Sequence, residues 1–330
     1  MSATLRLGIL GTARIAPQAV IRPARDSVEV DVVAVASRDP RRAKEFAAKH
    51  HIPKSYGGYA ALLADPDVDA VYVPLPNGLH GRWALAALAA GKHVLGEKPF
   101  TANADEAREV AAAAGRAGRV VMEAFHYRYH PLAARMAEIV ASGELGTVRD
   151  VRASVCFPLP RFGDIRYRWD LAGGALMDAG CYAVHMARLL GGGEPEVVTA
   201  TAATRSPNVD RAMRAGLTFP GGHTGVVRCS LWSADLLRVN ARVVGSRGEL
   251  RVLNPLAPHV FHRLTVRTPD TRRIERLIRR PTYAYQLDAF AGAVLRGEPI
   301  LTGPDDSIRT MTVVDAIYRT AGLPPREPTR

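Results

Sequence analysis

The sequence is poor in cysteine, poor in lysine and free of long apolar runs. Its three cysteines (Cys156, Cys181 and Cys229) are far apart and odd in number, which argues against a disulfide framework. They form no CxxC or Cys/His cluster, so no metal site is expected. No segment approaches the ~20 consecutive apolar residues of a membrane-spanning helix, and the first residues lead into a strand-like run without a secretory leader. We therefore expect a soluble, cytoplasmic protein with reduced thiols.

The charge is strongly positive but not concentrated. The 44 basic residues give a formal net charge of +12, and no basic run interleaved with aromatics marks a nucleic-acid site. The charge is expected to attract anionic ligands, and neither nucleic acid nor membrane is expected as a partner.

The first part of the chain alternates strand-like and helix-like segments. Short apolar runs rich in Val, Leu and Ile predict strands, and Ala-rich stretches between them have helical spacing. Such alternation predicts a doubly wound parallel sheet of the Rossmann type. The predicted strands are 5–10, 30–36, 70–75, 93–97 and 120–124; the predicted helices are 39–50, 80–90 and 105–117.

The pattern changes after residue 127. A run of strands with Gly/Pro turns predicts a C-terminal α+β domain with a large, mostly antiparallel open-faced sheet. We expect an NADP-binding domain at residues 1–126 and a substrate-binding and oligomerisation domain at 127–330. The tail, 323–330, is expected to be loose. The predicted strands here are 147–157, 196–204, 214–219, 224–231, 237–244, 249–252 and 264–267; the predicted helices are 131–141, 285–295 and 305–318.

A glycine turn follows the first predicted strand. A dinucleotide site needs a tight turn there, so that backbone N–H groups at the next helix face the pyrophosphate. Gly11 can make that turn, and Ala13 and Ala16 are small enough for close approach, although the middle glycine of the usual pattern is missing. The position before a predicted helix favours a cofactor site. The candidate residues of this turn are Gly11, Thr12, Ala13, Arg14 and Ile15.

The end of the second strand distinguishes between cofactors. NAD sites usually carry Asp or Glu there for the ribose 2′-hydroxyl, whereas NADP sites carry neutral and basic residues. Here Ser37 and Arg38 stand at that position, Arg42 follows, and Asp39 before Pro40 is expected to cap the next helix. NADP(H) is the predicted cofactor and NAD is the alternative. The competing interpretation of Arg38 is that it is an ordinary surface arginine without a role in cofactor binding.

Lys98 stands out because arginine supplies almost all the positive charge. A lysine can exchange a proton, whereas arginine stays protonated. Lys98 ends a predicted parallel strand, where open α/β sheets bind ligands. By position alone, a catalytic lysine and a solvated loop charge are equally good interpretations.

Several segments together resemble one known family. Gly-Lys-His-Val-Leu-Gly-Glu-Lys-Pro (91–99) looks like the lysine motif of the glucose–fructose oxidoreductase/inositol dehydrogenase/MocA family. Pro-Leu-Pro-Asn-Gly-Leu-His (74–80) resembles its Pro-Asn-x-x-His segment, and 123–131 its domain junction, with His126 where Met is usual. Gly-Gly-Ala-Leu-Met-Asp-Ala-Gly-Cys-Tyr (173–182) resembles its second active-site motif. The likeness continues through 245–248 to 315–318 and so covers essentially the whole chain.

The resemblance implies residue roles. Lys98 would hydrogen-bond the reacting oxygen and assist Tyr182 as the acid/base, while Asp178, four residues earlier, would share a helical face with Tyr182. Tyrosine at this position is typical of the branch with dimeric dihydrodiol dehydrogenase and NADP-dependent D-xylose dehydrogenase. Without the resemblance, Tyr182 would be interpreted as a packing residue. Further cofactor-binding candidates are Leu75, Pro76, Asn77, His80, Glu97 and Lys98; substrate-binding candidates are His126, Arg128, Arg166, Trp169 and Tyr182.

The sequence departs from the family pattern at two glycines: the usual triple glycine reads Ala172-Gly173-Gly174, and Ala13 replaces a commoner glycine. The resemblance implies that Ala13 is tolerated in the tyrosine branch, whereas Ala172 could tighten the pocket floor and leaves substrate identity open. The first hypothesis is hydride transfer between NADP(H) and a sugar, polyol or trans-dihydrodiol carbon. A ketoreductase acting on a nucleotide-linked keto-sugar is the second, and a non-catalytic NADP sensor is the third. An open sheet is expected to leave an apolar face, which predicts a homodimer or homotetramer through the C-terminal sheet.

Overall fold

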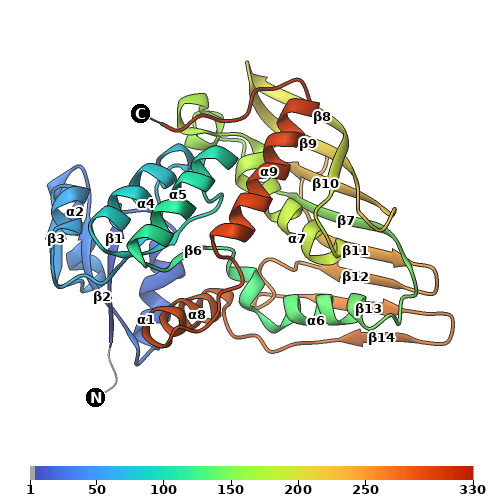
Figure 1. The fold of residues 1–330 in the computed structure, drawn as a ribbon, viewed down its shortest axis with the longest axis horizontal. Coiled ribbons are helices and arrows are strands. Elements are labelled where there is room, and N and C mark those ends of the chain that lie inside the picture. The colour runs from blue at the N-terminus through green and yellow to red at the C-terminus, as the bar shows by residue number, and fades with distance from the viewer. Residues whose placement is uncertain (1–3, 330) are drawn as a thin grey trace. The chain divides into compact units, whose positions relative to one another are not determined.

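A computed structural model describes residues 4–329. The chain forms two compact units, labelled in Figure 1 by their elements. The first unit comprises the described residues of Met1–His126 with Tyr283–Ser307 and Pro328–Arg330, and the second comprises Tyr127–Thr282 with Ile308–Glu327. Among the described residues, no helix has both the length and the apolar character needed to cross a membrane.

The first unit is built on a six-stranded parallel sheet. Its strand order is β3-β2-β1-β4-β5-β6, the order of a dinucleotide-binding fold. The predicted strands of this region are therefore confirmed, while the short β3 and α3 have no counterpart in the sequence-based prediction. The strands are β1 (Leu5–Leu10), β2 (Val30–Ala36), β3 (Lys54–Tyr56), β4 (Ala70–Val73), β5 (His93–Gly96) and β6 (Val121–Glu123).

Local signals define the ends of α2 and α5. Asp39 accepts from the backbone N–H of Arg41 at 2.9 Å and so caps α2, as predicted. Gly118 adopts φ 59° and ends α5. The helices are α1 (Arg22–Arg25), α2 (Pro40–His50), α3 (Tyr59–Leu63), α4 (His80–Ala89), α5 (Ala104–Ala117) and α8 (Thr282–Arg296).

The helix after β1 differs from a regular α-helix. A π-helical turn, Pro17–Ile21, precedes α1, and the Arg22 N–H donates to the Pro17 carbonyl five residues back. Pro23 follows directly and has no N–H to donate, so the regular hydrogen-bond series could not continue through it. The predicted helix is present, with a wider first turn.

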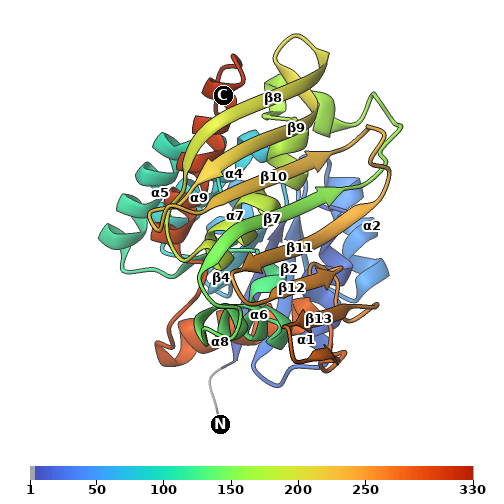
Figure 2. The same ribbon diagram turned by 90° about the vertical axis from the view of Figure 1, so that its right-hand side faces the viewer.

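The second unit is built on an eight-stranded sheet of order β14-β13-β12-β11-β7-β10-β9-β8 (Figure 2). All neighbouring pairs are antiparallel except β7 with β10, which confirms the mostly antiparallel prediction. β14 was not predicted, because three of its four residues are charged and only Ile274 is apolar. The strands are β7 (Val148–Cys156), β8 (Glu196–Ser206), β9 (Val209–Thr218), β10 (Thr224–Ser230), β11 (Arg238–Gly245), β12 (Glu249–Leu253), β13 (Arg263–Arg267) and β14 (Arg272–Glu275).

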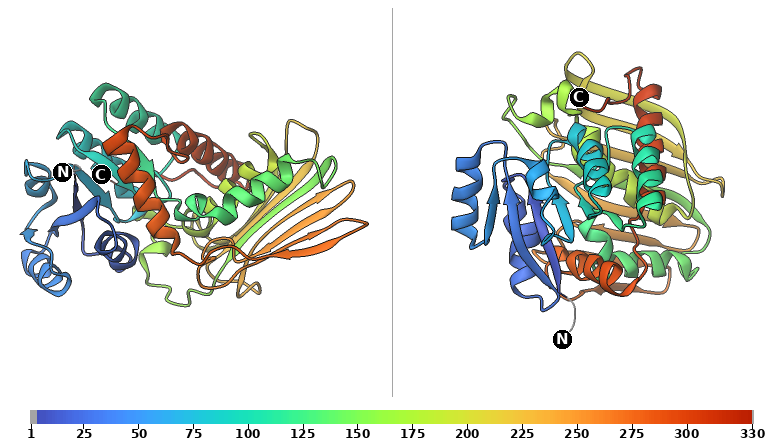
Figure 3. Two further views of the ribbon diagram at one scale, coloured as in Figure 1. Left: turned by 90° about the horizontal axis from the view of Figure 1, so that it is seen from below. Right: turned by 60° about the vertical axis from the view of Figure 1, so that its left-hand side comes forward.

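Helices cover one face of this sheet. The left view of Figure 3 shows the strands nearly edge-on with helices along one side, and α7 packs on β7 and β10. The helices of this region are α6 (Pro131–Ala141), α7 (Cys181–Gly191) and α9 (Pro304–Thr320). The three cysteines are free and buried.

The C-terminal tail contradicts one expectation. The described residues beyond α9, up to 329, form no helix or strand, yet Arg326 is fully buried, with none of its surface exposed. Its guanidinium lies over the Tyr318 ring at 4.0 Å. The prediction of a loose tail is wrong here, because distant residues, rather than a local pattern, hold this segment.

Candidate functional site

The turn after β1 requires glycine. Gly11 has φ +112°, and its N–H donates to the Ala36 carbonyl at 2.8 Å. A Cβ on Gly11 would come within 3.1 Å of Leu75 Cδ2, in a backbone conformation that side chains rarely adopt. The turn therefore keeps the backbone open at the carboxyl edge of the sheet, which is the kind of surface a pyrophosphate needs. Arg14, further along, is exposed.

The end of β2 presents positive charge without a free carboxylate. Asp39 is occupied as the α2 cap, and its own N–H donates to Ser37 Oγ at 3.3 Å. In the part of the chain that the structure describes, neither Arg38 nor Arg42 has a carboxylate ion-pair partner. Burial raises the pKa of the nearby Tyr59 phenol, while the charges of Arg38 and Arg42 act in the opposite direction. Sequence reasoning missed Tyr59, whose ring also meets Trp83 edge-on at 4.7 Å.

The turn that carries Lys98 is held by neighbours close in sequence. The Glu97 carboxylate accepts from the Tyr72 hydroxyl at 2.6 Å and from the Lys98 N–H at 3.2 Å. Lys98 itself is half-buried and follows the last strand residue of β5 by two positions. Glu97 therefore fixes the backbone of the lysine turn, where the sequence predicted a cofactor contact.

His80 also holds the Lys98 turn in place. Its Nδ1 lies 2.7 Å from the Pro99 carbonyl and its Nε2 lies 2.7 Å from the Leu75 carbonyl. Burial lowers the pKa of His80, although both carbonyls favour N–H groups on the ring. With both nitrogens occupied, the ring positions the lysine turn against the end of β4, and direct contact with the cofactor remains a prediction. Asn77 begins the 3₁₀ turn that leads into His80.

An aromatic pair lies at the end of the first unit's N-terminal segment, at His126. His126 is buried, and its ring lies 4.2 Å from that of Tyr283 on α8. Burial raises the pKa of Tyr283 strongly, and the charge of Glu97 acts in the same direction. Sequence reasoning missed Tyr283, because nothing in α8 indicates contact with a residue so distant in the chain.

In the second unit, the predicted motif starts with two tightly packed glycines and continues in a π-helical turn, Leu176–Gly180, directly before α7. Such turns are frequent at functional sites. Asp178 lies in this turn and Tyr182 in the first turn of α7, and both are almost fully buried. Ala172 adopts φ 55°, a left-handed conformation in which the family's usual glycine would be less strained.

Arg166 is already paired. Its Nε lies 3.2 Å from Asp178 Oδ1, and its Nη1 lies 3.0 Å from Asp164 Oδ1. Of the predicted substrate residues, Arg166 and Tyr182 therefore share a neighbourhood with Asp178, while Trp169 lies under the guanidinium of Arg326 at 4.9 Å. Arg128 is half-buried at the start of the second unit. The charge of Arg166 is largely balanced before any ligand binds.

Two residues beside Tyr182 were missed. The Tyr127 ring lies 6.1 Å from the Tyr182 ring, and the Tyr127 hydroxyl lies 2.5 Å from His185 Nδ1. His185 is three residues after Tyr182 in α7, a spacing that places both on neighbouring positions of one helix face. That spacing was a usable signal for His185; Tyr127 had none.

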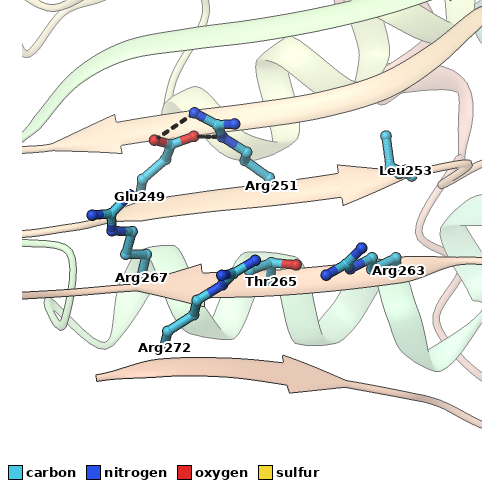
Figure 4. Close-up of a pocket in the computed structure, with 7 residues that line it drawn as sticks. All are labelled: Glu249, Arg251, Leu253, Arg263, Thr265, Arg267 and Arg272. Atoms are coloured by element: carbon cyan, nitrogen blue, oxygen red, sulfur yellow. Dashed lines mark hydrogen bonds and ion pairs between the residues drawn. The ribbon is translucent and has the colours of Figure 1, made fainter.

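The outward face of the large sheet is charged. Leu250 and Val252 of β12 are buried, whereas Arg251 between them is exposed, and pairing extends this outward row to Arg242 and Arg152. A groove of about 370 Å³ lies on this face, and Figure 4 shows the side chains that line it. The expectation of an apolar face is wrong along β7, β11, β12 and β13, where arginines occupy outward positions that alternate with buried aliphatic residues and Leu253 is an exposed apolar neighbour. The groove is lined by Glu249, Arg251, Leu253, Arg263, Thr265, Arg267 and Arg272.

The chain matches two family descriptions. Residues 5–125 match "Oxidoreductase family, NAD-binding Rossmann fold" (GFO/IDH/MocA), and residues 133–251 match "GFO/IDH/MocA C-terminal domain".

Individual proteins extend the similarity over almost the whole chain. It is 42% identical to D-xylose 1-dehydrogenase (NADP(+)) 2 of Haloferax volcanii, over 96% of this chain and 97% of the relative. It is 38% identical to trans-1,2-dihydrobenzene-1,2-diol dehydrogenase of Mus musculus, covering 77% and 76%. Among solved structures, a 3-ketoreductase from Actinomadura kijaniata in complex with NADP and TDP-benzene aligns with a TM-score of 0.88 and 34% identity, covering 96% and 98%. The predicted family is confirmed: the chain belongs to the GFO/IDH/MocA family of oxidoreductases.

Proposed function

We propose that this protein is an NADP(H)-dependent oxidoreductase that transfers a hydride between the nicotinamide and a sugar, polyol or trans-dihydrodiol carbon. The observation that carries the proposal is the pair of motifs ending in Lys98 and Tyr182 within a full-length match to the family. Variants of the Actinomadura 3-ketoreductase with a lysine changed to alanine and a tyrosine changed to phenylalanine have solved structures. The altered lysine and tyrosine lie as many positions apart in that chain as Lys98 and Tyr182 do here.

NADP(H) is the proposed cofactor. Its 2′-phosphate would meet Ser37, Arg38 and Arg42, and the absence of a carboxylate ion pair on either arginine among the described residues supports this. Asp39, the acidic side chain at the end of β2, caps α2 through its Oδ1, which favours a backbone role over the ribose contact of an NAD site. The Haloferax relative is a D-xylose 1-dehydrogenase that is named for NADP(+), and the Actinomadura structure is a complex with NADP.

The remaining cofactor contacts are proposed at the carboxyl edge of the parallel sheet. Backbone N–H groups of the turn at Gly11, Thr12, Ala13, Arg14 and Ile15 would face the pyrophosphate. Leu75, Pro76, Asn77 and Lys98 would approach the nicotinamide end, and Glu97 and His80 would hold the lysine turn in place.

The bound cofactor supplies or accepts the hydride. Tyr182 would hold the proton exchanged with the reacting oxygen, and the Lys98 ammonium would donate a hydrogen bond to the same oxygen as charge develops there. Asp178 would orient this end of α7 through Arg166. His126, Arg128, Arg166 and Trp169 are the proposed substrate neighbours.

The second candidate, a ketoreductase of a nucleotide-linked keto-sugar, is supported by the Actinomadura relative, whose structure includes TDP-benzene. The pairing of Arg166 with Asp164 and Asp178 weakens it, because a diphosphate is bound best by arginines without carboxylate partners. A non-catalytic sensor is the third candidate, and retention of both Lys98 and Tyr182 argues against it.

A homodimer or homotetramer through the C-terminal sheet remains part of the proposal. The helices of the second unit cover one face of that sheet, and the other face carries rows of arginines beside Glu249. Like charges would oppose a face-to-face contact at low salt, so the assembly should strengthen as salt screens them. Sedimentation across dilution at two ionic strengths tests this; a monomeric mass under every condition would remove the proposal. The buried free thiols support a reducing location such as the cytoplasm.

The first experiment is NADP⁺ reduction, followed by absorbance, with aldoses, inositols, trans-dihydrodiols and sugar nucleotides, repeated with NAD⁺. Lys98→Ala and Tyr182→Phe should each reduce kcat/KM by about 100-fold or more, while exposed Lys44→Ala serves as the matched control. Turnover only with sugar nucleotides selects the second candidate. No turnover despite tight NADP⁺ binding selects the sensor, and full turnover in Lys98→Ala would show that the active site lies elsewhere.

A further inference from the structure

The C-terminal tail places one charged side chain deep inside the second unit. Arg326 is fully buried, and its guanidinium carbon lies over the ring of Tyr318, at 4.0 Å, and over that of Trp169, at 4.9 Å. Its Nε donates to the Gly173 carbonyl at 2.7 Å, and its Nη2 donates to Asp210 Oδ1 at 2.7 Å. A buried charge is tolerated only when paired and hydrogen-bonded, and Arg326 meets both conditions.

Asp210 of β9 connects this arginine to the active-site motif. Its Oδ2 accepts from the Leu176 N–H at 2.7 Å, and its Oδ1 also accepts from the Tyr318 hydroxyl at 3.0 Å. The Leu176 N–H lies at the start of the π-helical turn and has no carbonyl of an earlier turn to bind. Asp210 therefore caps the helix that carries Tyr182, and Arg326 balances the charge of that cap.

Gly174 packs closely against Asp210 and Arg326. It adopts φ +142°, and a Cβ there would lie 2.2 Å from Asp210 Oδ1 and 2.6 Å from Arg326 Nη2. The Gly174 carbonyl in turn accepts from the Asp178 N–H at 3.0 Å. The ion pair, the glycine and the turn bearing Asp178 thus form one continuous set of contacts.

We propose that Arg326 is a positioning residue for the reaction: with Asp210 and Tyr318 it fixes residues 173–176, and through them the helix start that presents Asp178 and Tyr182. The inference rests on the proposed function, since it assigns Tyr182 to catalysis. The C-terminal tail is then part of the active-site scaffold, although none of its residues is expected to touch the substrate.

Guanidinium geometry is essential to this role. One side chain must donate in two directions, to Gly173 and to Asp210, while its guanidinium packs over two aromatic rings. A lysine ammonium that reaches Asp210 would lose the stacking on the aromatic rings and the second hydrogen bond, to the Gly173 carbonyl. The expected order of activity is therefore wild type, Arg326→Lys and then Arg326→Ala.

The test compares Arg326→Ala and Arg326→Lys with Arg319→Ala, an exposed arginine of α9 in the same unit. We expect kcat to fall by about 10- to 100-fold in Arg326→Ala, with the dissociation constant for NADP⁺ changed less than about twofold because the proposed cofactor residues belong to the first unit. Added methylguanidinium, but not sodium chloride at equal ionic strength, should restore part of kcat by occupying the vacated place. In Arg326→Lys, which retains the positive charge, the pH at which kcat is half-maximal should shift.

Hydrogen exchange gives a readout that does not depend on activity. Amides of residues 173–182 should exchange faster in Arg326→Ala and recover with methylguanidinium, while Arg319→Ala matches wild type. Wild-type kcat and unchanged exchange in Arg326→Ala would overturn the proposal, even if the variant melts at a lower temperature. If wild type shows no turnover but the exchange result holds, Arg326 still fixes residues 173–176. In that case the proposed function fails, and so does the role of Arg326 as a positioning residue for the reaction.

Discussion

The Lys98 turn of the first unit and the Tyr182 helix of the second are held in opposite ways. The contacts around Lys98 come from residues 72–99: Tyr72 binds Glu97, and His80 joins the Leu75 and Pro99 carbonyls. The start of the Tyr182 helix depends on Asp210 and Arg326, which are 34 and about 150 positions from the groups that they bind in the motif.

This difference separates local from long-range construction. A turn held by neighbours in sequence is visible as a continuous motif, whereas a buried ion pair closed between distant segments leaves no local pattern. The second arrangement also carries the greater energetic risk, because breaking one partner of a buried pair leaves an uncompensated charge.

The largest effect is expected from Asp210→Ala. It leaves the Arg326 charge and the Leu176 N–H without their acceptor, so the free energy of unfolding should fall by about 3–5 kcal/mol. Urea unfolding measures it, with exposed Asp270→Ala as control. A loss no larger than the control's would mean that the second unit does not depend on this long-range pair.

Glu106→Gln tests a buried acid of the first unit. Burial raises the pKa of Glu106 to about 7, from an ordinary value of 4.5. The folded state therefore holds this proton more tightly, and its stabilisation is complete below about pH 4.5 and is lost as pH rises through 7, by about 3 kcal/mol. Glutamine keeps an acceptor for the Ala102 N–H, so the variant should gain stability above pH 7.

The matched control for that experiment is Glu45→Gln, an exposed carboxylate on α2 of the same unit, because the charge of Glu109 contributes to the raised pKa of Glu106. Thermal unfolding from pH 4.5 to 8 should give parallel curves for wild type and Glu45→Gln, and a flatter curve for Glu106→Gln. Identical slopes for all three would contradict the assigned burial.

His80→Ala should cost about 2 kcal/mol, because it leaves the Leu75 and Pro99 carbonyls without their partner in a buried place. If the Lys98 turn is a local construction, the faster hydrogen exchange should stay within residues 72–100. Exposed His51→Asn, which suits the left-handed backbone there, is the control. Exchange that spreads through the sheet would contradict the local character of this turn.

Asp39→Ala should have the smallest effect, about 1 kcal/mol, as the loss of a helix cap. NADP⁺ affinity should be unchanged, because the carboxylate is used by the backbone of α2. Calorimetric titration measures the affinity, and Asp31→Ala, an exposed site on β2, is the control. A rise in NADP⁺ affinity or a loss of NAD⁺ binding would give Asp39 a cofactor role instead.

Most elements of both units could be predicted because their signals are local. The strand–helix alternation, the Asp39 cap and the glycine after β1 each depend on a few adjacent residues, as do the Lys98 and Tyr182 motifs. The strands β3 and β14 were missed because they are too short to show a period.

The sequence by itself determined the family, the parallel and mostly antiparallel sheets, and the glycine turn, because hydrophobic period and turn chemistry act over short distances. Only the tertiary structure decided that Tyr127 and His185 meet beside Tyr182, that arginines line part of the open sheet face, and that the tail buries the charge of Arg326. These contacts depend on which distant segments fold against one another, and the polar side chains that make them look, in sequence, like ordinary surface residues.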